Sequence, residues 1–401
     1  MDKVLLPDIK HLHQLDVYLA HGGYEALRKA LTMKPEEVTD EVKKSGLRGR
    51  GGACFPTGLK WSFMPRESAK PKYLCVNGDE SEPGTFKDRQ LFELNPHLVI
   101  EGAVIAAYAI GAGTIYVYVR GEYGKWIRML QRAVDEASAK GFLGENILGS
   151  SFSTQLTIHK GAGAYICGEE SSLMNSIEGD RGYPRVKPPF PAQFGLWGCP
   201  TTINNVETIA CVPHIVTNGA GWFAGIGAPK HPGPILVGVS GHVNRPGVYE
   251  LPTGVPILEI INNYAGGVPG NKKIKAVIPG GSSTPILRGD RLEGVAMDAE
   301  SLKAAGSAVG TAGMIVMDEE TDLIAVLARI AHFYHHESCG QCTPCREGTG
   351  WMEKILNRFV EGKGRIEDID LLMSVANNIE GNTICALGDA AAWPVQSMIR
   401  N

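Results

Sequence analysis

Four cysteines in the last part of the chain have the spacing of iron–sulfur ligands. Cys339, Cys342 and Cys345 are each separated by two residues, and Cys385 is the only later cysteine. A tight loop ahead of a helix can direct three thiolates at one small volume. A cubane cluster takes four such ligands, of which the last is often remote in sequence. The spacing therefore predicts one [4Fe–4S] cluster on these four residues, and a protein that moves electrons.

Structural zinc on four thiolates is the competing interpretation. Zinc sites usually pair two Cys-x2-Cys knuckles, whereas three of these cysteines share one run and one stands alone, so the spacing favours the cluster. His332, His335 and His336 lie nearby in sequence, and we interpret them as a solvated helix face rather than as ligands. The other cysteines have apolar neighbours and are interpreted as core thiols: Cys54, Cys75, Cys167, Cys199 and Cys211.

Three glycine-rich segments could surround a nucleotide. In residues 49–60, backbone N–H groups and the Lys60 ammonium could approach phosphate oxygens. This segment matches neither the Walker A pattern nor the dinucleotide fingerprint, so a plain glycine turn stays open. Residues 77–84 and 161–171 place acids beside glycines after predicted strands, where α/β sheets bind ligands. Each acidic segment could also be a solvated turn; together the three predict a nucleotide site without identifying the nucleotide.

The first half of the chain supplies the elements that must position these segments. We predict an N-terminal helical segment, with two short helices, over residues 1–45. From 46 to 234, strand and helix patterns alternate, with a buried strand at 73–77, a helix at 96–110 and a strand at 114–119. This alternation predicts an α/β domain with a partly parallel sheet.

The composition changes twice further along. Residues 235–316 are predicted as a small β-grasp-like domain with strands at 235–241, 248–251 and 274–278. After that the glycine density falls, and apolar residues follow helical spacing. We therefore predict a helical cluster-binding domain with four helices over 317–401.

Composition and charge exclude other classes of protein. The apolar fraction of 43% and the charged fraction of 20% are those of a globular protein of several domains. A net charge of −4 argues against nucleic acid as a partner. An odd number of cysteines without a secretion signal indicates a reducing compartment. The uncharged stretch 102–119 is long enough for a membrane span, but Gly111 and Gly113 divide it, so we predict no span.

Several motifs, taken in order, carry a resemblance to a known family. The chain resembles the NADH-binding flavoprotein subunits of respiratory complex I, the bacterial F subunits, over essentially its whole length. The motifs that carry this resemblance are Gly-Arg-Gly-Gly-Ala at 49–53, Phe-Pro-Thr-Gly-Leu-Lys-Trp-Ser at 55–62, Glu-Pro-Gly-Thr-Phe-Lys-Asp-Arg at 82–89, Gly-Ala-Gly-Ala-Tyr-Ile-Cys-Gly-Glu-Glu at 161–170, Lys-Pro-Pro-Phe-Pro at 187–191, Asn-Asn-Val-Glu-Thr at 204–208 and Ser-Cys-Gly-Gln-Cys-Thr-Pro-Cys-Arg at 338–346.

The resemblance implies a Rossmann-like domain that binds FMN and NADH. Around the FMN phosphate and ribityl chain it places Gly49, Gly51, Gly52 and Lys60. Around the flavin it places Asn77, Asp79, Glu80, Gly168, Glu169, Glu170, Asn204 and Asn205. Around the NADH adenine it places Phe55, Phe63 and Phe190, with Glu82 and Lys187 nearby. Without the resemblance, core packing would be the preferred interpretation of the three phenylalanines.

The implied reaction is oxidation of NADH by hydride transfer to FMN, followed by single-electron transfer to the [4Fe–4S] cluster and on toward quinone. No side chain is expected to act as acid or base, and Glu170 is expected near the nicotinamide. The alternatives are the same diaphorase module in an NAD-linked hydrogenase or formate dehydrogenase, a cluster-only electron relay, and a zinc-stabilised nucleotide sensor.

The implied partners are a thioredoxin-like [2Fe–2S] subunit and a large multi-cluster subunit. The implied location is cytoplasmic, in a peripheral arm attached to the inner face of the plasma membrane through other subunits. Two positions depart from the family pattern, which usually has glycine at Cys54 and alanine at Gly78. Gly78 is sterically permissive, whereas Cys54 adds a β-carbon in a loop that we expect to need positive φ or close approach to a ligand.

Overall fold

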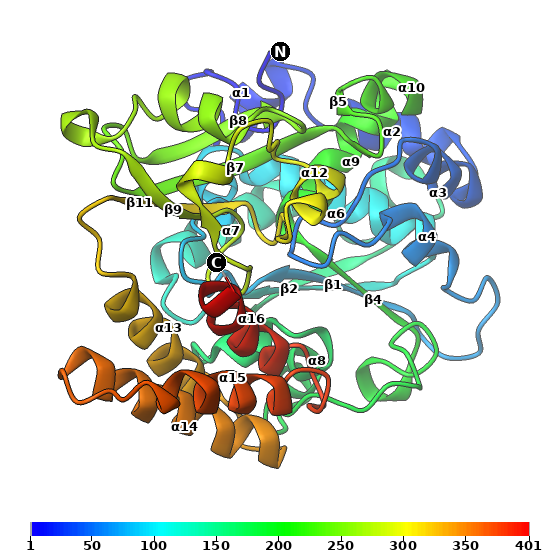
Figure 1. Ribbon diagram of the computed structural model, residues 1–401. Helices are drawn as coiled ribbons and strands as arrows, with labels where there is room; N and C mark the ends of the chain where they lie inside the picture. The colour runs from blue at the N-terminus through cyan, green and yellow to red at the C-terminus, as the bar shows by residue number, and fades with distance from the viewer. Residues whose placement is uncertain (1, 401) are drawn as a thin grey trace.

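The computed structural model describes residues 2–400, and its first part is built around a parallel sheet (Figure 1). The strand order is β3-β2-β1-β4, and all neighbours are parallel. The strands are β1 (Tyr73–Gly78), β2 (Thr114–Val119), β3 (Gln155–Lys160) and β4 (Thr201–Asn205). The predicted strands at 73–77 and 114–119 are confirmed. Most of β1 is buried, as expected of a central strand with helices on both faces.

Helix α6 (Pro96–Ile110) is the central helix of this part. Pro96 occupies its first turn, and Gly111 ends it in the left-handed conformation with φ 72°. Nearly every residue of α6 is buried, and β2 follows at once. The uncharged stretch 102–119 is therefore a core helix, a glycine turn and a core strand. Among the described residues, no helix is both long and apolar enough to cross a membrane.

The N-terminal segment forms three helices, not the predicted two: α1 (Leu15–Ala20), α2 (Glu25–Thr32) and α3 (Pro35–Lys44). The chain breaks twice, because Tyr24 adopts a left-handed conformation and Pro35 begins a new helix. The three helices share one hydrophobic core with α6 and α9 (Val206–Asn218). Buried Glu101 on α6 accepts hydrogen bonds from the Tyr24 and Leu27 N–H groups, which fixes the start of α2.

Further helices and short strands surround the parallel sheet and connect it to the middle part of the chain. They are α4 (Thr57–Ser62), α5 (Asp88–Leu94), α7 (Gly124–Ala139), α8 (Glu170–Glu178), α10 (Ala220–Ala224), β5 (Gly227–Ala228) and β6 (His231–Pro232). Of the sheet elements, β4 is the one the alternation does not predict, because its sequence Thr-Thr-Ile-Asn-Asn has little apolar character.

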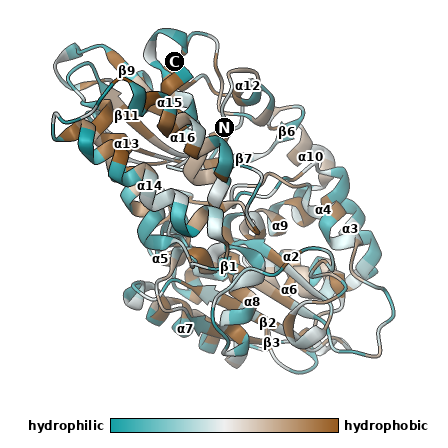
Figure 2. Ribbon diagram, turned by 60° about the horizontal axis from the view of Figure 1, so that its bottom comes forward, coloured by the Kyte–Doolittle hydropathy of each residue, from teal (hydrophilic) through white to brown (hydrophobic). Residues whose placement is uncertain are grey.

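The middle part is a mixed five-stranded sheet in the order β10-β9-β11-β7-β8. Its strands are β7 (Pro234–Gly241), β8 (Gly247–Pro252), β9 (Ile274–Ile278), β10 (Leu287–Arg288) and β11 (Gly313–Asp318). Central β7 and β11 are parallel, and the other pairs are antiparallel. The short helix α11 (Ile257–Glu259) continues into a π-helical turn, and α12 (Ala299–Ala304) lies further along. The predicted β-grasp-like character is supported, and Figure 2 shows hydrophobic colouring along β9 and β11.

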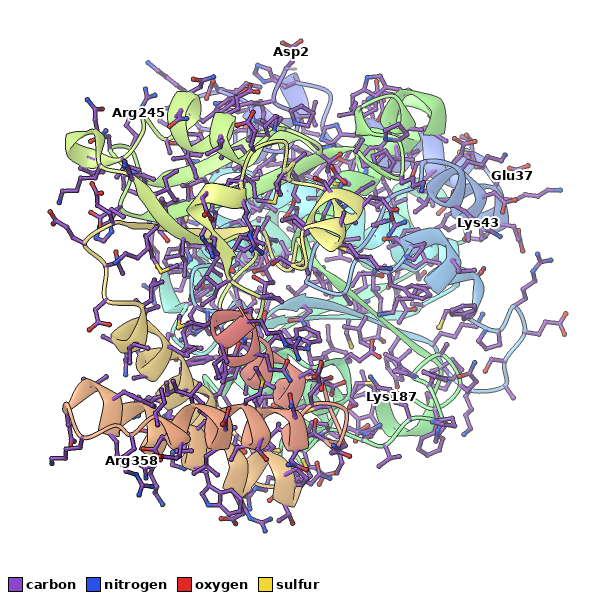
Figure 3. All side chains as sticks on the ribbon, in the orientation of Figure 1. Asp2, Glu37, Lys43, Lys187, Arg245 and Arg358 are labelled. Carbon is purple, nitrogen blue, oxygen red and sulfur yellow. The ribbon has the colours of Figure 1, made fainter. Side chains whose placement is uncertain are left out.

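Four helices end the chain, as predicted: α13 (Leu323–Glu337), α14 (Thr343–Val360), α15 (Glu367–Ile379) and α16 (Leu387–Arg400). Asp322 caps α13 by accepting the N–H groups of Ile324 and Ala325. Buried residues of this bundle join one cluster with Cys75 and Tyr118 of the parallel sheet, so the bundle packs against the sheet's outer side (Figure 1). Arg358 of α14 marks the outer surface of the bundle (Figure 3).

Candidate functional site

The carboxyl ends of β1 and β4 bring two predicted asparagines side by side. Asn77 is the register partner of Asn205, and Val76 is that of Asn204. The Asn77 amide donates to the Gly168 carbonyl at 2.8 Å, which draws in the segment before α8. Three separate stretches of the sequence therefore meet at one edge of the sheet, where α/β proteins bind ligands.

Asp79 is the clearest sign of a ligand at this edge. Its N–H donates to Asn77 Oδ1 at 3.0 Å, and its Oδ1 accepts from the Ser81 hydroxyl at 2.8 Å. Its Oδ2 is buried and has no hydrogen-bond partner among the described residues. Burial raises the pKa of Asp79 to about 7. A ligand N–H or O–H would satisfy this oxygen, and FMN carries both in its flavin ring and ribityl chain.

The two asparagines of β4 are held by different partners. Asn204 Oδ1 accepts the Trp61 indole N–H at 2.9 Å. Asn205 Oδ1 caps α9 by accepting the Glu207 N–H at 2.9 Å, and its Nδ2 donates to Asp88 Oδ2 at 2.7 Å. An amide nitrogen has two N–H groups, so Asn205 keeps one that no described residue takes.

The glycine-rich loop lies against this edge. A β-carbon at Gly51 would stand 3.0 Å from the Asn205 β-carbon, so glycine permits the close approach. The Gly49 N–H donates to the Phe55 carbonyl at 2.8 Å, which closes the loop. Gly52 and Cys54 have φ of 119° and 51°, so the expectation of positive φ at Cys54 is confirmed. Cys54 is half-buried, unlike the four core thiols Cys75, Cys167, Cys199 and Cys211, which are buried as predicted.

A cluster of lysines and acids lies at the start of α8. Glu170 is 3.0 Å from Lys60 Nζ and 2.7 Å from Lys187 Nζ, and Lys187 is also 2.9 Å from Glu169. Burial opposes the charge on Glu170, but Lys60 and Lys187 outweigh it and lower the pKa of Glu170 to about 2. Glu169 also caps α8 through the Ser171 and Ser172 N–H groups. Lys187 reaches this cluster from the loop after α8 (Figure 3).

Three predicted phenylalanines are on the surface rather than in the core. Phe55, Phe63 and Phe190 are 44%, 48% and 55% exposed. The Phe55 and Phe63 ring centroids are 6.2 Å apart. Exposed rings cost free energy in water and are available to stack on a base.

Two predicted acids have their carboxylates occupied by the protein. Glu80 accepts from the Asp88 N–H at 2.7 Å, Arg89 Nε at 3.1 Å and the Tyr123 hydroxyl at 2.8 Å. Its main chain is therefore the part left for a ligand.

Glu82 binds across an interface between parts of the fold. It accepts from the Tyr165 hydroxyl at 2.6 Å and the Ser283 N–H at 2.7 Å. Ser283 comes after β9 of the mixed sheet, so Glu82 joins that sheet to the edge of the parallel one.

The four predicted cysteine ligands line one small cavity, together with Ile166, Ser338, Gln341, Ile384 and Leu387. Gly340 has φ 78° and turns the loop between α13 and α14, and Cys345 lies in the first turn of α14. Burial raises the pKa of Cys345 to about 11 and that of Cys385 to about 12. These thiols need the positive charge of bound iron to become thiolates.

This donor set fits a cubane better than a single ion. Four thiols surround the cavity. Yet among residues 2–400 no three His, Cys, Asp or Glu side chains converge closely enough to hold one metal ion. Thiolates around a space of this kind are typical of iron–sulfur clusters. The neighbouring histidines are half-exposed on α13, where His332 and His335 pair with Glu353 at 2.8 Å and 2.5 Å, so they form a surface contact as predicted.

One short segment touches both places. In Tyr165–Gly168, Ile166 lines the cysteine cavity, while the Gly168 carbonyl accepts from Asn77 at the sheet edge. The Tyr165 N–H donates to Glu337 at 3.1 Å, which attaches the segment to the end of α13. Sequence reasoning missed Ile166, and it also missed Trp61, Ser81, Lys87 and Asp88 as partners of the site. The motif at 82–89 was the signal for Lys87 and Asp88.

Comparison with known families agrees with this arrangement. Residues 42–214 match the Nuo51 FMN-binding domain, residues 236–326 match an SLBB domain, and residues 325–401 match the NADH-ubiquinone oxidoreductase-F iron–sulfur binding region. The predicted cofactors FMN and [4Fe–4S] are confirmed at the level of the domains.

Similar proteins cover almost the whole chain. The NADH-quinone oxidoreductase F subunit of Rickettsia bellii (strain OSU 85-389) is 55% identical over 97% of this chain and 94% of its own length. An F subunit of Rhizobium meliloti (strain 1021), the one numbered 2, is 54% identical over 98% and 94%. A solved NAD+-reducing [NiFe]-hydrogenase in the H2-reduced state has a TM-score of 0.84 and 38% identity, over 92% of this chain but 61% of that one. The chain therefore belongs to the family of NADH-quinone oxidoreductase F subunits.

Proposed function

We propose that this chain oxidises NADH within a respiratory NADH-quinone oxidoreductase and passes the electrons singly toward quinone. The observation that carries the proposal is the segment Tyr165–Gly168, which reaches from the polar edge of the parallel sheet to the cysteine cavity. A flavin at that edge and a cluster in that cavity would be separated by this one segment. Short separation is what electron transfer between two bound groups requires.

When bound, FMN supplies the conversion between the electron pair of NADH and the single electrons that a [4Fe–4S] cluster accepts. The protein's part is to bind and orient. Around the phosphate and ribityl chain we place Gly49, Gly51, Gly52 and Lys60. Around the flavin we place Asn77, Asp79, Glu80, Gly168, Glu169, Asn204 and Asn205. In the cavity we place Cys339, Cys342, Cys345 and Cys385 as cluster ligands.

The NADH site is proposed over the exposed aromatic rings. Phe55, Phe63 and Phe190 offer faces for the adenine, with Lys187 and Glu82 nearby. Glu170 is placed beside the nicotinamide, where its ion pairs with Lys60 and Lys187 keep it charged. No side chain of this set needs to gain or lose a proton for hydride transfer; their role is to hold the reacting atoms in line and exclude water.

The same proposal covers organisation and surroundings. We place domain boundaries after residues 45, 234 and 316. The expected neighbours are a thioredoxin-like [2Fe–2S] subunit and a large multi-cluster subunit, which would attach the chain to the inner face of the plasma membrane from the cytoplasmic side. A hydrogenase-type diaphorase is the second candidate, because of the solved hydrogenase structures. It is disfavoured because this chain spans only 61% and 64% of those hydrogenase chains, against 94% of its relatives among the F subunits.

The test is an anaerobic NADH titration of the purified chain with its FMN and iron–sulfur content restored. Visible absorbance follows the flavin, and EPR follows the cluster. The expected result is bleaching of the flavin band together with a reduced [4Fe–4S] signal. If NADH leaves a flavin-loaded protein unchanged, the proposal is wrong. Flavin bleaching without a cluster signal would contradict the electron path but not NADH oxidation.

A further inference from the structure

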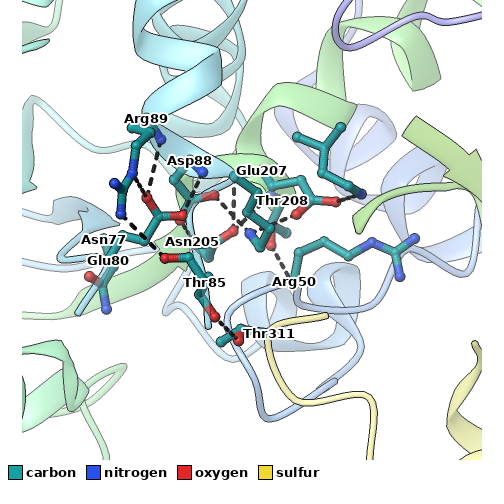
Figure 4. A network of polar contacts seen from close by, with 12 residues as sticks. Arg50, Asn77, Glu80, Thr85, Asp88, Arg89, Asn205, Glu207, Thr208 and Thr311 are labelled. Carbon is teal, nitrogen blue, oxygen red and sulfur yellow. Dashed lines mark hydrogen bonds and ion pairs between the residues drawn. The ribbon is translucent and has the colours of Figure 1, made fainter. Parts of the chain in front are cut away.

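A buried ion cluster lies next to the polar edge of the parallel sheet (Figure 4). The Lys87 side chain is 2% exposed, and its Nζ is 2.8 Å from Asp88 Oδ1 and 2.7 Å from Glu207 Oε2. Burial opposes the charge on Lys87, but Asp88, Glu207 and Glu80 outweigh it and raise its pKa, so Lys87 is a cation. One ammonium therefore compensates neighbouring buried carboxylates, which would be costly to bury alone.

Asp88 connects this ammonium to Asn205. Its Oδ1 accepts from Lys87, and its Oδ2 accepts from Asn205 Nδ2 at 2.7 Å. On its other side, Asn205 Oδ1 accepts the Glu207 N–H at 2.9 Å. A flipped amide would point its oxygen at the Asp88 carboxylate and its NH2 at a backbone N–H, so both contacts would become repulsive. The charge on Asp88 thus fixes which way the amide points.

The same cluster holds the glycine-rich loop. Thr208 is next to Glu207 in α9, and its hydroxyl accepts the Arg50 N–H at 2.8 Å. The Gly51 backbone packs directly on Asn205. Glu207 Oε1 also accepts the Leu236 N–H at 2.8 Å, which ties β7 of the mixed sheet to the same point. Displacing Glu207 or Asn205 would therefore move the loop as well.

We propose that Lys87 is a positioning residue for FMN. It does not touch the ligand; through Asp88 it sets the direction of the Asn205 amide, and through Glu207 it supports the start of α9 and the loop 49–52. This inference rests on the proposed placement of FMN against Asn205 and that loop. Without the ammonium, Asp88 would take up a proton or turn away, and the remaining Asn205 N–H would lose its fixed direction.

The test measures the dissociation constant of FMN, by quenching of its fluorescence, on deflavinated full-length protein purified with its accompanying subunits. Lys87→Met removes the charge and keeps the stem. Lys87→Met with Glu207→Gln removes one charge of each sign, so a loss of binding cannot come from unbalanced charge. Asp88→Asn keeps Lys87 and cannot accept from both Lys87 and Asn205 through its single oxygen. Lys125→Met is the control, because this exposed lysine pairs with Glu93, away from the cluster.

The double variant and Asp88→Asn should both bind FMN at least about tenfold more weakly, as is usual when a partner behind a ligating residue is lost. Lys125→Met should bind normally. With FMN saturating, the KM for NADH should stay unchanged in all variants, because the aromatic site is not involved. Melting without FMN shows whether each variant is folded; if the Lys87 variants are not, Asp88→Asn decides.

Asn205→Ser separates this inference from the proposed function. Serine preserves the cap of α9 but removes the amide N–H. If Asn205→Ser weakens FMN binding while the double variant and Asp88→Asn bind like wild type, Lys87 is only a stabilising residue and the inference is overturned. If Asn205→Ser also binds FMN like wild type, the placement of FMN against Asn205 is wrong, and the inference falls with it.

Discussion

The cysteine cavity and the polar edge of the parallel sheet prepare for their cofactors by opposite means. The cavity takes three of its thiols from one seven-residue run, and its other lining residues are uncharged. The edge takes its groups from several distant segments and rests on buried ion pairs around Lys87, Asp88 and Glu207. The cavity therefore depends on iron to ionise its thiols, whereas the edge is already held in place by the protein's own charges.

The contrast indicates where each site is vulnerable. Loss of iron leaves neutral thiols around a space, with few contacts of their own to keep the loop between α13 and α14 in place. Loss of FMN leaves a hydrogen-bonded network in which Asp79 Oδ2 and one Asn205 N–H lack partners among the described residues. We expect the bundle to respond strongly to metal removal and the sheet edge to respond weakly to FMN removal.

The largest expected effect is at the cavity. Cys385→Ala should abolish the [4Fe–4S] EPR signal and the transfer of electrons beyond this chain, because a cubane needs its fourth thiolate. NADH oxidation with an artificial acceptor that takes electrons from the flavin should persist. Cys199→Ala, which removes another buried thiol, should keep the signal. A full-strength cluster signal in Cys385→Ala would show that the remote ligand is assigned wrongly.

A smaller effect is expected at the acid–lysine cluster of the edge. Glu170→Gln removes the charge between Lys60 and Lys187, and kcat/KM for NADH should change by roughly tenfold, the size of one charged hydrogen bond. Steady-state kinetics with NADH measure this. Glu178→Gln, at the other end of α8, is the matched control because it pairs with Arg185 instead. Unchanged kinetics in Glu170→Gln would remove it from the nicotinamide site.

Asp79 gives the edge a pH dependence when FMN is absent. Its pKa in the folded chain is about 7, above the unfolded value, so the folded state holds an extra proton at intermediate pH. Stability should therefore fall as pH rises from about 4 to about 7. Asp79→Asn removes this loss and should be more stable than wild type at pH 8, by on the order of 1–2 kcal/mol, but not at pH 4.

Chemical denaturation of FMN-free protein at the two pH values checks this prediction. Asp135→Asn, an exposed change on α7, should show no such difference. Equal stability of Asp79→Asn and wild type at pH 8 would mean that the Asp79 carboxylate is not strained in the folded protein. The same variant should bind FMN more weakly, because an amide is a poorer acceptor than a carboxylate.

The smallest effect concerns the surface of the bundle. Burial opposes ionisation of Glu353, but hydrogen bonds from His332 and His335 lower its pKa. The contact should stabilise the bundle above the ordinary Glu range and be lost as pH falls below it. Glu353→Gln should cost about 0.5–1 kcal/mol near neutral pH, because the pairs are partly exposed. Thermal melting with the cluster intact measures this, and a cost of several kcal/mol would contradict a surface role.

Local sequence was enough for features that depend on spacing within a few residues. The run Cys339 to Cys345, the helix at 96–110 with its terminal glycine and the strands at 73–77 and 114–119 all come from local chemistry and periodicity. The same is true of the four C-terminal helices and the positive φ at Cys54. Glycine-rich motifs also pointed to the right edge of the sheet, although the identity of the nucleotide came from resemblance.

Only the tertiary structure decided which groups meet. Strand β4 has little apolar character, and it becomes a strand because β1 pairs with it; this places Asn205 beside Asn77. The carboxylates of Glu80 and Glu82 resemble ligand groups in the sequence, but distant residues occupy them in the fold. The role of Lys87 likewise depends on Glu207, far along the chain. The physical reason is that burial and long-range pairing set the charge and direction of a side chain, and neither is encoded in its sequence neighbours.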